Sequence, residues 1–90
     1  INYDYTYILK TKSYAATLWF YGLFLISQFE DDSTGVYYLE QAYDWHIKYG
    51  TDINNMRKVA KDLKDSYRRL YKKTKQIGYK EAMNSIILSD

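Results

Sequence analysis

The segment INNMRKVAKDLKDSYRRLYKKTKQI, residues 53–77, carries the clearest periodic pattern in the chain. Its apolar positions recur in alternating steps of three and four residues, which is the spacing of an a/d seam on a helix. Neither proline nor glycine interrupts the pattern, so it predicts one continuous helix about 40 Å long. The positions of this seam are Ile53, Met56, Ala60, Leu63, Tyr67, Leu70, Thr74 and Ile77.

The seam predicts packing against another helix, and the charged positions outside it predict a second kind of contact. Within the seam, we expect a partner helix to pack on Met56, Leu63, Tyr67 and Leu70. Outside it, residues 51–80 carry ten Lys or Arg against three Asp, whereas the whole chain has a net charge of +2. The basic side chains that we expect to face an anionic partner are Arg57, Lys61, Lys64, Arg68, Arg69 and Lys72. The alternative is that they form the solvated side of the helix.

Three further helices are predicted, at residues 13–29, 36–49 and 79–88. The short turns between them favour antiparallel neighbours. We expect Gly50 to end the helix over 36–49 and Gly78 to end the long helix. The fold class is therefore all-α, an antiparallel bundle or set of helical hairpins in a single small domain.

The segments outside these helices contain cap residues and an N-terminal arm. Residues 1–10 alternate tyrosine with polar residues, which predicts an extended N-terminal arm. Ser33 or Thr34 is suited to cap the helix over 36–49, because a short side-chain oxygen can accept from a free backbone N–H. Thr51 or Asp52 is suited to cap the long helix for the same reason.

Residues 13–29, SYAATLWFYGLFLISQF, contain no charged side chain and are apolar around nearly the whole helical wheel. A helix without a polar face lies either at the centre of a bundle or in a membrane. A membrane span needs roughly 20 apolar residues, and this stretch is at the lower limit. Basic residues flank its start and acidic residues its end, which is typical of a short anchor. We expect a core helix and keep a single membrane span as the alternative.

The composition argues against several classes of function. Without cysteine, the chain can form neither a disulfide nor a thiolate metal site. Its single histidine, His46, is expected to be a partly buried side chain of the helix over 36–49. The four glycines stand alone, and no nucleophile, zinc or phosphate-loop motif is present. We therefore expect no enzyme activity, no cofactor, no metal site and no small-molecule substrate.

Aromatic residues make up 19% of the chain, and 12 of its residues are tyrosine. Tyrosine and tryptophan are enriched at protein interfaces, where one end of the ring is buried and the other stays hydrated. This content exceeds what one small core requires. It predicts self-association or insertion into a larger assembly.

The first two predicted helices carry large and small residues at fixed spacings, namely Leu18, Tyr21, Gly22 and Leu25, followed by Gly35, Leu39 and Ala42. This arrangement, over about residues 18–49, resembles a tetratricopeptide-type helical hairpin. The chain departs from the family pattern in two ways, because the interval from Gly22 to Gly35 is one residue longer and the closing proline is absent. The resemblance implies a protein-binding scaffold, one that belongs to a longer array if about three repeats are needed.

These patterns lead to one leading hypothesis and two alternatives. The leading hypothesis is a non-catalytic protein-interaction module or small subunit that binds a protein partner, or its own copies, through aromatic and seam faces. The first alternative is a membrane accessory subunit anchored by residues 13–29. The second is a small regulator that binds nucleic acid or an acidic partner through the basic helix over 57–75.

Overall fold

The computed structural model describes residues 12–50 and 52–86. Within these ranges the chain forms α-helices and no strand, so the all-α prediction is confirmed. The helices are α2 (Lys12–Phe29), α3 (Asp32–Tyr49), α4 (Ile53–Thr74) and α5 (Ile77–Ser85). The predicted arm over residues 1–10 lies outside the described residues.

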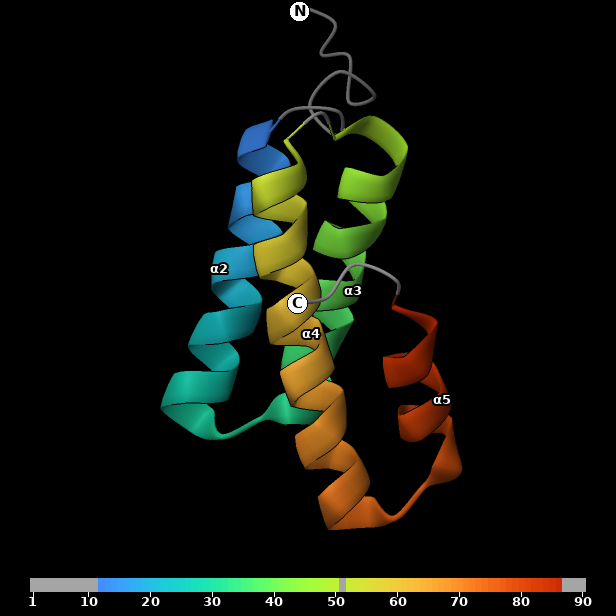
Figure 1. Ribbon diagram of the computed structural model, residues 1–90. Helices are drawn as coiled ribbons and strands as arrows, with labels where there is room; N and C mark the ends of the chain where they lie inside the picture. The colour runs from blue at the N-terminus through green and yellow to red at the C-terminus, as the bar shows by residue number, and fades with distance from the viewer. Residues whose placement is uncertain (1–11, 51, 87–90) are drawn as a thin grey trace, which may run out of the picture.

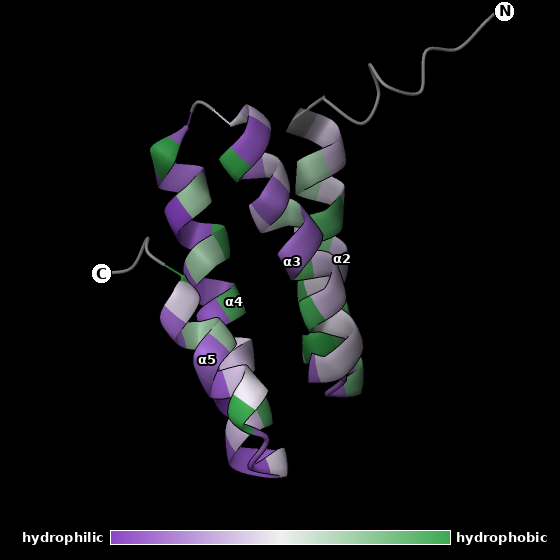
Figure 2. Cartoon of the chain, turned by 90° about the vertical axis from the view of Figure 1, so that its right-hand side faces the viewer, coloured by the Kyte–Doolittle hydropathy of each residue, from purple (hydrophilic) through white to green (hydrophobic). Residues whose placement is uncertain are grey.

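The four helices run alternately up and down, so each is antiparallel to the next along the chain (Figure 1). Helix α3 packs against both α2 and α4, and α5 packs against α4. The molecule is thus a row of two helical hairpins, α2–α3 and α4–α5, which are joined through α3 and α4. Figure 2 shows that the second hairpin is the more hydrophilic, because purple dominates α4 and α5.

Two aspartates cap the helices at their N-termini. Asp31 caps α3, since its side chain accepts a hydrogen bond from the backbone N–H of Thr34 at 3.1 Å. The expectation of a cap at Ser33 or Thr34 was wrong. Helix α3 begins at Asp32, earlier than predicted, because the carboxylate of Asp31 accepts a hydrogen bond from a backbone N–H in the first turn. Asp52 caps α4 as expected, and its carboxylate accepts from the backbone N–H of Asn54 at 3.0 Å.

Of the two glycines predicted to end helices, Gly50 does follow the last residue of α3, although not in a left-handed conformation, whereas the prediction for Gly78 was wrong. Gly50 has extended backbone angles, φ −73° and ψ 142°, and Gly78 lies inside α5. Helix α4 ends instead where Lys75 takes the left-handed conformation, at φ 61°. The hydroxyl of Thr74 helps to end the helix there, because it donates to the carbonyl of Leu70 at 2.8 Å and accepts from the N–H of Gln76 at 3.2 Å.

The core lies between the two hairpins. A larger cluster of buried residues joins α3, α4 and the residue that follows α5, and a smaller cluster joins α2, α3 and α4. The apolar side chains that recur along α4 therefore pack against other helices of the same chain. The larger cluster is Val36, Leu39, Ala60, Leu63, Tyr67, Leu70 and Ile86, and the smaller is Leu18, Ala42 and Val59.

Two glycines let α2 and α3 approach each other closely. A Cβ atom on Gly22 would lie 2.9 Å from the backbone oxygen of Gly35. A Cβ atom on Gly35 would lie 2.4 Å from Cγ1 of Ile26 and 3.0 Å from the backbone oxygen of Gly22. All three distances are shorter than ordinary van der Waals contact, so a side chain at either position would force the two helices or Ile26 to move.

Helix α2 is an edge helix, which corrects the expectation that it lies at the centre of a bundle. Its Ala15, Leu18 and Gly22 are buried, whereas Phe20 and Phe24 on the opposite side are exposed. The residue sequence could not show this, because an all-apolar wheel does not indicate which side is covered. In the part of the chain that the structure describes, no helix is both long and apolar enough to cross a bilayer.

Candidate interaction surfaces

The outer side of α2 carries a group of exposed aromatic side chains that continues onto α3. We call this group the aromatic face. Its members, with their exposed fractions, are Phe20 (61%), Tyr21 (46%), Phe24 (49%), Phe29 (66%) and Tyr37 (58%). Together they amount to nearly three fully exposed rings, or about 550 Å² at about 200 Å² for each aromatic side chain. This area is at the upper end of the largest apolar patch on a typical monomer.

Ring contacts join the members of the aromatic face in two groups, and Phe20 stacks instead on its neighbour Trp19. The ring of Tyr38 lies edge-on to Tyr21, with centroids 4.7 Å apart, and also contacts Tyr37 at 5.2 Å. At the other end of the face, Phe24 and Phe29 meet edge-on at 5.7 Å. Such edge-to-face pairs favour defined ring orientations within each group.

Two polar side chains of α2 near the aromatic face make hydrogen bonds within their own helix. The hydroxyl of Thr17 donates to the carbonyl of Ser13 at 2.8 Å, and that of Ser27 donates to the carbonyl of Phe24 at 3.3 Å. Both hydroxyls therefore donate to backbone carbonyls of their own helix. Since residues 13–29 also lack charge, the outer side of α2 can be desolvated at low cost.

The seam residues predicted to bind a partner are turned toward the chain's own core. Leu63, Tyr67 and Leu70 are buried, and Met56 is half-buried. The hydroxyl of Tyr67 donates to the carboxylate of Glu40 on α3. Burial first, and this hydrogen bond second, raise the pKa of Tyr67 above its usual value. The middle of the seam is thus occupied by α3 and α5, and binding of a separate partner there stays a prediction.

The structure brings five of the six predicted basic residues together on one side of α4. We call this group the basic row, and its members are Arg57, Lys61, Lys64, Arg68 and Lys72. They follow one another at steps of three or four residues, so they share a side of the helix. Lys64 is half-buried and the others are exposed to solvent.

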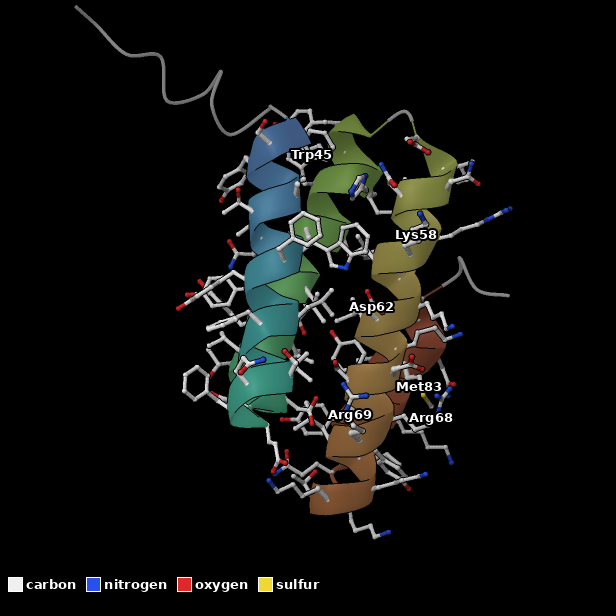
Figure 3. The ribbon with its side chains drawn as sticks, turned by 90° about the vertical axis from the view of Figure 1, so that its left-hand side faces the viewer. Trp45, Lys58, Asp62, Arg68, Arg69 and Met83 are labelled. Carbon is white, nitrogen blue, oxygen red and sulfur yellow. The ribbon has the colours of Figure 1, made fainter. Side chains whose placement is uncertain are left out.

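Arg69 does not belong to the basic row, although it was predicted with it. Its guanidinium lies 2.9 Å from the carboxylate of Asp32 at the start of α3, and it also donates to the hydroxyl of Ser66 at 3.0 Å. Figure 3 shows Arg69 on the side of α4 that faces α2, with Arg68 on the other side. The partner of Arg69 is 37 residues away in the chain, so local spacing could not identify it.

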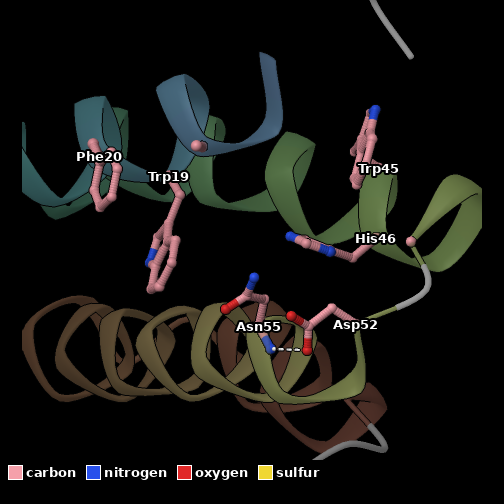
Figure 4. A pocket seen from close by; sticks show the side chains of 8 residues that line it. Trp19, Phe20, Trp45, His46, Asp52 and Asn55 are labelled. Atoms are coloured by element: carbon pink, nitrogen blue, oxygen red, sulfur yellow. Dashed lines mark hydrogen bonds between the residues drawn. The ribbon is translucent and has the colours of Figure 1, made fainter. Parts of the chain in front are cut away.

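A cavity of about 270 Å³ lies where α2 meets the end of α3 and the start of α4. Trp19, Phe20, Trp45 and His46 surround it, with Asp52 and Asn55 on the α4 side (Figure 4). The indole N–H of Trp19 donates to Asp62 at 2.7 Å, and Asp52 accepts from the backbone of α4. These polar groups stabilise the packing of the helices, and no motif in the chain indicated the cavity beforehand.

No protein-family model, curated protein or solved structure matches the chain. The resemblance to a tetratricopeptide-type hairpin therefore stays a prediction. At the positions that carry it, Gly22 faces Gly35, Leu39 and Ala42 are fully buried, and Tyr21 is exposed.

Proposed function

We propose that the chain is a non-catalytic interaction module that associates with a second copy of itself through the aromatic face of α2. The observation that carries the proposal is the position of α2. This helix is uncharged along residues 13–29 and yet lies at the edge of the molecule with its outer rings exposed. An apolar patch of this size on a small protein is typical of an interaction surface.

The area of the aromatic face supports a second copy as its occupant. If two copies cover each other's face, about 1,100 Å² of surface is removed from water, which is just above the roughly 1,000 Å² expected of a biological interface and within the range of weak, transient ones. Association at this area is expected to be weak, with a dissociation constant in the micromolar range. Tyrosine and phenylalanine at the centre of the patch are the kinds of residues that carry binding energy.

The absence of charge along residues 13–29 also favours a symmetric pairing. In a two-fold interface each surface meets its own copy, so a charged surface would meet like charge. The aromatic face avoids this repulsion because its rings have no net charge. Phe20 and Phe24 lie near the middle of α2 (Lys12–Phe29), so two antiparallel copies of this helix can cross there. The tetratricopeptide-like spacing gives further support for a binding scaffold.

The test is the concentration dependence of the mass of the full chain in solution, measured by sedimentation equilibrium without detergent. We expect the mass to rise from 10.8 kDa toward twice that value as the concentration passes through the micromolar range. Phe24→Lys should weaken the association at least about 30-fold, because a central anchor contributes about 2 kcal/mol or more. Asn54→Lys, which adds the same charge at an exposed position of α4, should leave it unchanged.

A wild-type chain that stays monomeric at millimolar concentration would contradict the proposal. So would a dimer that Phe24→Lys and Asn54→Lys affect equally. Circular dichroism of each variant shows whether the helices are kept, and Phe24 is exposed enough for its replacement to be tolerated.

A further inference from the structure

We infer that the basic row of α4 is a docking surface for the phosphate backbone of nucleic acid. The five cations of the row extend from Arg57 to Lys72, a distance of about 22 Å at about 1.5 Å per residue. Four of them are exposed to solvent, so a ligand can reach their charges without any movement of the helices. This inference does not rest on self-association, since the aromatic face belongs to α2 and α3.

Nearby acids do not neutralise the basic row. Asp65 pairs with Arg68 at 2.9 Å, but both side chains are substantially exposed, so the pair is weak and can be exchanged for a phosphate. Asp62 is turned toward α2, where it accepts from Trp19 at 2.7 Å. Asp32 is held by Arg69 on the same side of α4. Asp62 and Asp32 are thus engaged on the side of α4 that faces α2, and the basic row keeps a net positive charge.

One more cation extends the positive surface beyond α4. The ammonium of Lys80 on α5 lies 6.0 Å from the centre of the ring of Tyr71, which is the neighbour of Lys72 in the chain. Its position over the ring fixes the cation beside the end of the row.

The composition of the row favours nucleic acid over an acidic protein. Its members are Lys and Arg, and the ring of Tyr71 beside the row is half-buried and covered by Lys80, whereas protein interfaces depend on exposed aromatic or aliphatic anchors. A nucleic acid presents a regular line of phosphates, and cations at regular steps along a helix can neutralise several of them at once. Lysines in a row contact phosphates without distinguishing bases, so the binding should be independent of sequence.

The test measures binding of the full chain to a fluorescent DNA duplex of about 20 base pairs at several salt concentrations. We expect micromolar affinity and equal binding of two unrelated sequences. Five phosphate contacts give a slope of log K against log salt of about −4.5, and about −3.6 if Arg68 stays with Asp65.

Two variants distinguish binding by the basic row from a general effect of the positive charge of the chain. Lys61→Gln removes one contact, so it should weaken binding about 8-fold at about 0.1 M salt and make the slope shallower by about 0.9. Lys48→Gln removes the same charge from an exposed position of α3 and should change neither quantity. Equal effects of the two variants would overturn the inference, and so would polyglutamate competing as strongly as the duplex. Absence of binding at about 0.05 M salt would overturn it as well.

Discussion

Replacing Gly22 by alanine tests whether facing glycines determine how α2 and α3 cross. The added Cβ would lie 2.9 Å from the backbone oxygen of Gly35, and 3.1 and 3.2 Å from two side-chain carbons of Leu39. A backbone oxygen cannot rotate away, and Leu39 is fully buried. The two helices must therefore separate, or the core must shift, to make room for one methyl group.

The expected magnitude is the difference between two opposing effects. Alanine in place of glycine normally stabilises a helix interior by about 1 kcal/mol. Overpacking a close contact costs about 1–3 kcal/mol. We therefore expect Gly22→Ala to lower the free energy of unfolding by up to about 2 kcal/mol. For a chain of this length, each kcal/mol corresponds to a fall of about 4–8 °C in Tm.

Gly78 supplies the matched control, because a Cβ atom there would meet nothing within 4 Å. Gly78→Ala lies in α5 and should be neutral or stabilise the chain by up to about 1 kcal/mol. The measurement is urea unfolding followed by far-UV circular dichroism. The reasoning fails if Gly22→Ala is as stable as Gly78→Ala, because the difference between them isolates the cost of the contact.

Three further predictions concern caps and contacts between helices. Asp52→Ala should lower the free energy of unfolding by about 1 kcal/mol through loss of the α4 cap, whereas Asp52→Ser keeps most of it, as urea unfolding can show. Trp19→Phe and Asp62→Ala should each lower the free energy of unfolding, because they remove a 2.7 Å hydrogen bond between α2 and α4. A double-mutant cycle should give a coupling energy of about 1–2 kcal/mol, and strictly additive effects of the two substitutions would contradict this. Hydrogen bonds from Thr34 lower the pKa of Asp31 below 3.8. The ionised carboxylate therefore stabilises the folded chain fully above that pH, and this contribution is lost as the pH falls through the lower pKa of the folded state. Asp31→Asn should therefore reduce the loss of stability between about pH 5 and about pH 2, and an unchanged acid profile would argue against the cap.

The long helix and its inner side could be predicted from the sequence because α4 is strongly amphipathic. Ala60, Leu63, Tyr67 and Leu70 recur at the helical period among charged neighbours, and all four are buried. Asp52 could be predicted as its cap because the residue precedes the first apolar position of the pattern. Local sequence is sufficient where one side of a helix differs chemically from the other.

The exposed side of α2 and the ion pair of Arg69 with Asp32 could not be predicted in the same way. All sides of α2 are apolar, so it is packing against α3 and α4, including that of Gly22 on Gly35, that leaves Phe24 pointing outward. Arg69 belongs to a run of basic residues, and its separation from them depends on Asp32 in another hairpin. The basic row could be predicted from its spacing, whereas the aromatic face depends on contacts between distant segments.

Helix α5 has the weakest attachment of the four helices, and this has a consequence for hydrogen exchange. The helix has nine residues, none of them buried, and Gln76 at its start makes no side-chain cap. A helix this short is unstable by itself, so it depends on Tyr79, Ala82 and Met83, which pack on the core, and on the buried Ile86 that follows it. We expect its amides to exchange through local opening, at a lower free energy than those of α4. Each opening would briefly uncover Leu63 and Tyr67, so the interior seam is accessible to a competing helix at the cost of detaching one short segment.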